Sequence, residues 1–109
     1  MLFRHDFGPR RNSIQEGPRP LVVVQTDALN KLDGYPLVIV VPLTTKRKPS
    51  ATFVQIEPSE QNQLTSTSWA ITNQVFTIAK DDLREPIGRV SKTELYGIKD
   101  GLKIAFAIS

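Results

Sequence analysis

The sequence predicts a mainly β (α+β) fold: a small, strongly bent antiparallel barrel or sandwich followed by one C-terminal α-helix. Three observations lead to this prediction. Short β-branched runs bounded by turn residues recur along most of the chain, which is typical of strands. A sustained helical spacing of apolar residues appears near the C-terminal end. The length of 109 residues suits a single domain spanning residues 1–109.

Two apolar runs dominate the first half of the chain. Leu21–Val24 follows a proline, and Leu37–Val41 is closed by Pro42. Both are short and β-branched, so we expect strands that are buried on both faces. Between them, Asp27–Leu32 is a possible helical turn, and the pair Asp33-Gly34 is a strong turn signal.

The second half of the chain adds further strands, so that five or six are expected in all. The third spans Thr52–Ile56 and the fourth spans Ser68–Ile71, and Ile87–Val90 is another short candidate. Val75–Ile78 either continues the fourth strand or forms a separate one.

The C-terminal segment has the pattern of a helix. Ser91 and Glu94 have the spacing of a capping box, in which a hydroxyl and a carboxylate satisfy two backbone N–H groups. Gly97 and Gly101 weaken the helix by about 1 kcal/mol each relative to alanine, or they allow another backbone to approach closely. The apolar residues that recur at helical spacing are Leu95, Ile98, Leu102, Ala105 and either Ile104 or Ile108.

Composition excludes several classes of protein. The absence of cysteine excludes disulfides, thiol nucleophiles and zinc–thiolate sites, and a single histidine cannot build a His-rich metal centre. A Ser-His-Asp arrangement would need His5, which lies on a terminus that we expect to be mobile. There is no phosphate-binding glycine loop, dinucleotide turn or carboxylate cluster, so no cofactor and no metal are expected.

Charge and hydropathy indicate the cellular setting. There are 14 Lys and Arg residues against 11 Asp and Glu, a net charge of +3 that is compatible with a nucleic-acid partner. No apolar run approaches the roughly 18 residues of a membrane helix, and the N-terminus lacks an apolar signal core. We therefore expect a small, soluble, cytoplasmic protein without a membrane partner.

Two basic segments adjoin the two predicted buried strands. Arg19 precedes the first strand at the end of the segment Gly8–Pro20, and Thr44 follows the second strand and opens the segment Thr44–Ser50. If these strands pair antiparallel, Arg19 and Thr44 share one rim. A guanidinium and a hydroxyl at one place suit phosphate binding, and RNA carries its own 2′-hydroxyl nucleophile. The alternative is that Arg19 is a solvated flank and Thr44 a turn residue.

The motifs around these residues resemble the MazF/PemK family, the endoribonuclease toxins of type II toxin–antitoxin pairs. Ser13–Pro20 resembles the family loop Ser-Glu-Gln-x-Gly-x-Arg-Pro, and Leu37–Thr45 resembles the strand that ends in Pro-x-Thr-Ser or Pro-x-Thr-Thr. Ser68–Ile78 is similar to the segment that usually reads Asp/Glu-Gln-Ile/Val-Arg-Thr-Ile, and Ile87–Ser91 with the closing helix also matches. The resemblance covers nearly the whole chain.

This resemblance implies an SH3-like antiparallel barrel with a C-terminal α-helix, related to the CcdB-like toxins, usually as a homodimer. It implies metal-independent cleavage of single-stranded RNA at short sequences, leaving a 2′,3′-cyclic phosphate. A cognate antitoxin would lay an extended segment over the RNA groove. Arg19 falls on the family's acid, base or phosphate binder, and Thr44 on the residue that holds the scissile phosphate. The expected substrate-binding residues are Gln15, Thr45, Ser68 and Asn73, together with Lys46 from the basic run Lys46–Lys48.

The chain also departs from the family pattern at three positions. Ile14 replaces a frequent glutamate, Asn73 stands at an often acidic position, and Phe76 replaces a frequent basic residue. Each change removes a charge that could move a proton or hold a phosphate. Because arginine stays protonated in proteins, Arg19 is expected to act electrostatically.

Two alternatives therefore accompany the nuclease hypothesis. A toxin-fold protein with weak or no catalysis could bind a protein target such as DNA gyrase, as CcdB toxins do with an exposed Trp at the terminal helix. The only tryptophan here, Trp69, lies in a predicted strand and is expected in the core or an interface. A plain RNA-binding module is the other alternative, with Phe53, Phe76 and Tyr35 as possible base-stacking residues.

Overall fold

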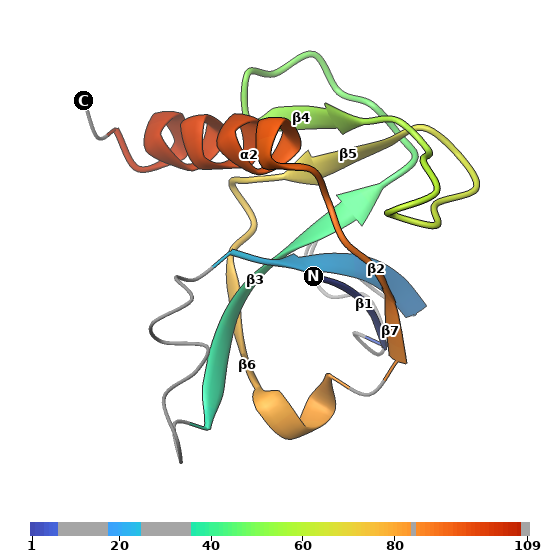
Figure 1. Ribbon diagram of the computed structural model, residues 1–109. Helices are drawn as coiled ribbons and strands as arrows, with labels where there is room; N and C mark the ends of the chain where they lie inside the picture. The colour runs from blue at the N-terminus through green and yellow to red at the C-terminus, as the bar shows by residue number, and fades with distance from the viewer. Residues whose placement is uncertain (7–17, 25–35, 84, 108–109) are drawn as a thin grey trace.

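The computed structural model describes residues 1–6, 18–24, 36–83 and 85–107, and shows a strongly curved sheet with one helix packed against it (Figure 1). A short 3-10 helix, η1, spans Lys80–Asp82 and precedes the last strand. The strands are β1 (Leu2–Asp6), β2 (Pro18–Val23), β3 (Leu37–Thr44), β4 (Phe53–Ile56), β5 (Ser68–Ile71), β6 (Phe76–Ala79) and β7 (Glu85–Gly88), and the C-terminal helix is α2 (Lys92–Ala105).

The seven strands form one antiparallel sheet in the order β4-β5-β3-β2-β1-β7, and β6 pairs with β3 outside this path. The expected mainly β fold with a C-terminal helix is confirmed. The expected barrel is not closed, because no pairing between described residues joins β4 to β7. Ile98 of α2 enters the core instead, so a helix contributes to enclosing the sheet.

β3 organises the sheet because it changes partner along its length. Its residues 37–40 pair with β6, its residues 43–44 pair with β5, and its other edge pairs with β2. The strand was expected to end before Pro42, but it continues to Thr44. Pro42 falls between the residues that pair with β6 and those that pair with β5, where its missing N–H removes no ladder hydrogen bond on that edge.

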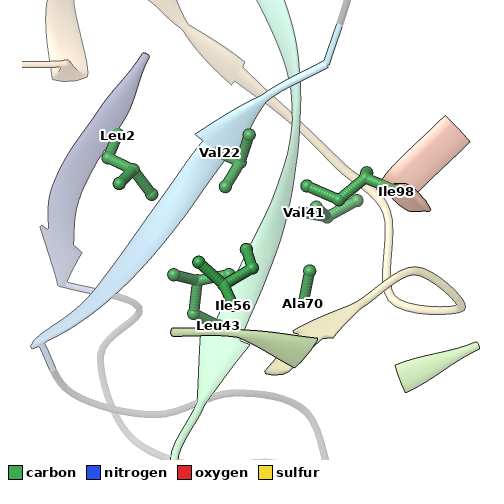
Figure 2. Packing of buried hydrophobic residues seen from close by; sticks show 7 residues of the cluster. All are labelled: Leu2, Val22, Val41, Leu43, Ile56, Ala70 and Ile98. Atoms are coloured by element: carbon green, nitrogen blue, oxygen red, sulfur yellow. The ribbon is translucent and has the colours of Figure 1, made fainter. Parts of the chain in front are cut away.

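A central core fills the space between the sheet and α2, as Figure 2 shows. A second cluster lies on the other face of β2 and β3, built on Leu21, Val38 and Val40. The expectation that the Leu37–Val41 run is buried on both faces is wrong at its start, because Leu37 and Ile39 are exposed. The buried residues of the central core are Leu2, Val22, Val41, Leu43, Ile56, Ala70 and Ile98.

Helix α2 begins where the sequence predicts. The Ser91 hydroxyl accepts from the Glu94 N–H (3.1 Å), and the Glu94 carboxylate accepts from the Ser91 N–H (2.8 Å), which completes the capping box. Gly101 allows close approach, but of a side chain and not of the expected backbone: a Cβ there would lie 2.7 Å from Oγ1 of Thr72. Ile104, one alternative for the buried face, is exposed.

The remaining expectations are met in part. β4 and β5 match the expected third and fourth strands, β6 is a separate strand, and β7 lies two residues earlier than expected. β1 has five residues and brings the number of strands among the described residues to seven. The possible helical turn at Asp27–Leu32 and the turn at Asp33-Gly34 lie outside the described residues. In the part of the chain that the structure describes, no helix is long and apolar enough to span a membrane.

Candidate functional site

Arg19 and Thr44 lie at the same end of the β2–β3 pair. These strands are antiparallel, and Leu21 lies opposite Pro42. Arg19 precedes Leu21 by two residues and Thr44 follows Pro42 by two, so both lie just beyond the paired residues at the same end of the two strands. Because side chains repeat every second residue in a strand, both also belong to one face of the sheet. The antiparallel pairing that a shared rim requires is therefore present.

The same line of residues continues across the neighbouring strands. In β1, His5 lies opposite Arg19, and in β5, Trp69 lies opposite Thr44. On the next strand, Gln55 of β4 lies opposite Trp69. We call His5, Arg19, Thr44, Trp69 and Gln55 the cross-strand row.

The cross-strand row lies on the face of the sheet turned away from the central core. Leu43 and Ala70 lie opposite each other and both belong to that core, where Figure 2 shows them. Thr44 and Trp69 are the next residue pair along in the two strands, so their side chains leave the opposite face. The side chains of the row can form hydrogen bonds or aromatic contacts, and they lie on the face opposite the central core.

The hydroxyl of Thr44 is held in place by its own loop. Thr44 is 8% exposed, and its Oγ1 accepts from the backbone N–H of Lys46 at 3.1 Å. A threonine hydroxyl that accepts one hydrogen bond keeps its own proton for donation. Thr45 and the basic run Lys46–Lys48 follow directly and are exposed, which puts positive charge beside this hydroxyl. Arg19 itself is half-buried.

Two expected substrate-binding residues lie away from the cross-strand row. Ser68 is buried on the opposite face of β5, and its hydroxyl donates to the Ser66 carbonyl at 3.1 Å. Asn73 is exposed in the turn after β5, at the other end of that strand from Trp69. Gln15, the departure at Ile14 and the possible stacking residue Tyr35 lie outside the described residues.

Sequence reasoning missed the outer members of the row. His5 was expected on a mobile terminus, but it lies in β1 beside Arg19. Trp69 was expected in the core or an interface, and it lies half-buried beside Thr44. Their position beside Arg19 and Thr44 depends on the strand register, which cannot be predicted from one amino-acid sequence. Among the described residues, no group of three or more His, Asp or Glu residues could hold a metal ion.

Comparisons with known proteins identify the family of this chain. The family model of PemK-like, MazF-like toxins of type II toxin–antitoxin systems matches residues 2–106. An endoribonuclease named MazF9 from Mycobacterium tuberculosis is 31% identical over 106 residues, covering 94% of this chain and 90% of that protein. An endoribonuclease MazF from Staphylococcus epidermidis is 29% identical over 110 residues, covering 99% and 89%.

The fold of this chain is also similar to that of a solved structure. It is described as an endoribonuclease in complex with its cognate antitoxin from a mycobacterial species. Its TM-score is 0.80 at 27% identity, and the match covers 99% of this chain and 92% of that one.

Proposed function

Because the chain belongs to the PemK-like, MazF-like toxin family of type II toxin–antitoxin systems, we propose that it is an endoribonuclease that cleaves single-stranded RNA at selected sequences without a metal ion. The observation that carries this proposal is the antiparallel pairing of β2 with β3, which brings Arg19 and Thr44 to the same end of the strand pair. The endoribonuclease names of the relatives that are 31% and 29% identical support it.

The reaction uses the substrate's own nucleophile. The 2′-oxygen of one nucleotide attacks the adjacent phosphorus, and the bond from phosphorus to the 5′-oxygen of the next nucleotide breaks. The 2′-hydroxyl loses its proton and the departing 5′-oxygen gains one, which leaves a 2′,3′-cyclic phosphate and a 5′-hydroxyl. The phosphate gains negative charge in the transition state, so fixed donors at its oxygens accelerate the step most.

Arg19 and Thr44 are suited to supply those donors. The Arg19 guanidinium is a planar, permanently charged fork that matches two phosphate oxygens. The Lys46 N–H orients the Thr44 hydroxyl, which can donate a hydrogen bond to an oxygen of the same phosphate. This hydroxyl is oriented before the substrate arrives, which lowers the cost of reorganisation.

The surroundings define the remaining parts of the proposal. Thr45 and Lys46 guide the RNA backbone, and Gln15 and Asn73 are further proposed RNA contacts. We propose a homodimer that acts in the cytoplasm and is neutralised by a cognate antitoxin. The similar mycobacterial structure described with its cognate antitoxin supports this partner. The gyrase-binding alternative expects an exposed tryptophan at the terminal helix. Trp69 lies in β5 instead, so it does not match that pattern.

The test is cleavage of a long RNA in EDTA by the purified protein, with the products examined for 2′,3′-cyclic phosphate ends. Arg19→Ala and Thr44→Val are each expected to lower the cleavage rate by roughly 10²-fold or more. Arg89→Ala is the matched control, because this exposed arginine lies outside the cross-strand row. An absence of discrete cuts, or cuts that persist in Arg19→Ala, would overturn the proposal.

A further inference from the structure

We infer that Trp69 is a base-stacking residue of this site, whose indole ring stacks on a base next to the phosphodiester that Arg19 and Thr44 hold. This inference rests on the proposed function and names a further substrate contact of the same site. It concerns the part of the RNA that gives affinity and register, not the bond that breaks.

The position of Trp69 in the sheet carries the inference. Trp69 lies directly opposite Thr44 in the β3–β5 ladder. Directly opposed residues of an antiparallel pair have Cβ atoms about 4.5–5.5 Å apart, so an aromatic ring in one strand reaches past its partner's side chain. A phosphate held at Thr44 would therefore have its neighbouring base within reach of the indole.

Trp69 is less buried than its neighbours in β5, including Ile71, which lies two residues farther along on the same face and is 3% exposed. Ser68 and Ala70 on either side of it are buried, whereas Trp69 is half-buried. Among the described residues, neither the central core nor the second cluster includes it. Its two partners across the strands, Thr44 and Gln55, are both polar. A large aromatic outside both clusters and between polar neighbours has the surroundings of a contact surface.

Helix α2 packs on the other side of this strand pair. A Cβ added at Gly97 would lie 3.1 Å from Val54, and one added at Gly101 would lie 3.1 Å from the same side chain. Val54 and Gln55 are consecutive in β4, so their side chains leave opposite faces. The helix thus covers the face of Val54, while the indole belongs to the face of Gln55.

Stacking on tryptophan explains why such a residue would be useful beside a phosphate site. Every base has a π-face, so an aromatic platform binds single strands with little dependence on sequence. The two donors on the row would hold the backbone and the indole would hold the base. Together they would set the register of the RNA relative to the reacting phosphorus.

Trp69 is the only tryptophan of the chain, so intrinsic fluorescence reports its surroundings directly. The probe is a randomised single-stranded 2′-deoxy oligonucleotide of about twelve nucleotides, which lacks the nucleophile and stays intact. Titration into the wild-type protein is expected to quench the emission in a saturable way. Anisotropy of the labelled probe is expected to show 5- to 100-fold weaker binding for Trp69→Leu, about the range seen on removing one stacked base contact.

Trp69→Phe and Tyr96→Leu complete the experiment. The phenylalanine variant keeps an aromatic face and is expected to bind within about threefold of wild type, with its fold checked by circular dichroism. Tyr96→Leu changes an exposed aromatic of α2, on the other side of the strand pair, and is expected to bind like wild type. Equal losses in Trp69→Phe and Trp69→Leu would overturn the inference, because stacking would then not be the property lost.

The outcomes separate this inference from the proposed function. If Trp69→Leu binds the probe and cleaves RNA like wild type, the stacking role is wrong and the nuclease proposal stands. If the wild type binds the probe with quenching but makes no cuts in RNA, the stacking role stands and the nuclease proposal is wrong. Binding of the probe without any change in tryptophan emission would also refute the stacking role.

Discussion

Helix α2 packs on the face of the β4–β5 pair that carries Val54, whereas the opposite face carries Trp69 and Gln55 beside Thr44. On the helix side, Ile98 is fully buried and a Cβ at Gly101 would overlap Thr72. On the other side, the cross-strand row presents polar and half-buried side chains. The face toward α2 thus serves packing, whereas the other face combines Trp69 and Gln55 with the apolar pair Phe53 and Ile71.

This difference leads to a simple expectation for mutants. Changes on the helix side should lower the free energy of unfolding and leave the activity per folded molecule unchanged. Changes in the cross-strand row should lower the activity per folded molecule and leave the free energy of unfolding nearly unchanged. The following four predictions are ordered by expected size: three change α2 or its N-cap, and one changes Lys46, close to Thr44 of the cross-strand row.

Ile98→Ala is expected to give the largest loss of stability. The side chain is fully buried in the central core, so its truncation leaves a cavity and should lower the free energy of unfolding by about 3 kcal/mol. Urea denaturation measures the loss, and RNA cleavage at low temperature measures the activity of the folded fraction. A large fall in cleavage rate with an unchanged denaturation midpoint would show that the two faces are coupled.

Gly101→Ala is expected to destabilise the protein although alanine favours helices. The added Cβ would lie 2.7 Å from Oγ1 and 2.9 Å from Cγ2 of Thr72. That threonine cannot rotate away freely, because its hydroxyl donates to the Thr52 carbonyl at 2.7 Å. We expect a net loss of about 1–2 kcal/mol, measured by urea denaturation.

Gly97→Ala is the matched control for that variant. Its Cβ would meet a single methyl group of Val54 at 3.1 Å, so a small adjustment of that side chain makes room. The helix-propensity gain of about 1 kcal/mol should then offset most of the cost. If Gly101→Ala proves as stable as Gly97→Ala, α2 lies farther from Thr72 than the structure places it.

Ser91→Ala is expected to cost about 1 kcal/mol, because it removes the hydroxyl of the capping box at the start of α2. Thermal unfolding followed by circular dichroism measures the change. Thr93→Ala, at an exposed position in the first turn of the same helix, is the control and should have little effect. Equal shifts in the two variants would mean that the capping hydrogen bonds contribute nothing measurable.

Lys46→Ala is expected to have the smallest effect, a loss of RNA affinity of only a few-fold. The backbone N–H of Lys46, which holds Thr44, remains in the variant, so only one exposed positive charge disappears. The salt dependence of binding should fall by roughly one phosphate contact. Lys103→Ala removes a matching exposed charge on α2 and should leave both affinity and salt dependence unchanged. The reverse pattern would place the RNA on the helix side.

Several elements could be predicted from local sequence alone. The limits of β5 at Ser68–Ile71 and the start of α2 after Ser91 depend on neighbours a few residues apart, so periodicity and capping chemistry were sufficient. The prediction that Arg19 and Thr44 lie at one end of a strand pair needed one further assumption, that β2 and β3 pair antiparallel, which they do. The extension of β3 through Pro42 was missed because it depends on where its two neighbours, β6 and β5, end and begin.

The residues themselves determined the mainly β class, the terminal helix and the two phosphate-binding candidates, because these depend on side-chain type and short-range spacing. Only the tertiary structure decided that the sheet stays open between described strands, that Ser68 faces the core side, and that Trp69 faces Thr44. The physical reason is that a strand has two faces related by a shift of one residue. Which face is buried, and which strand lies beside it, is chosen by packing against distant parts of the chain.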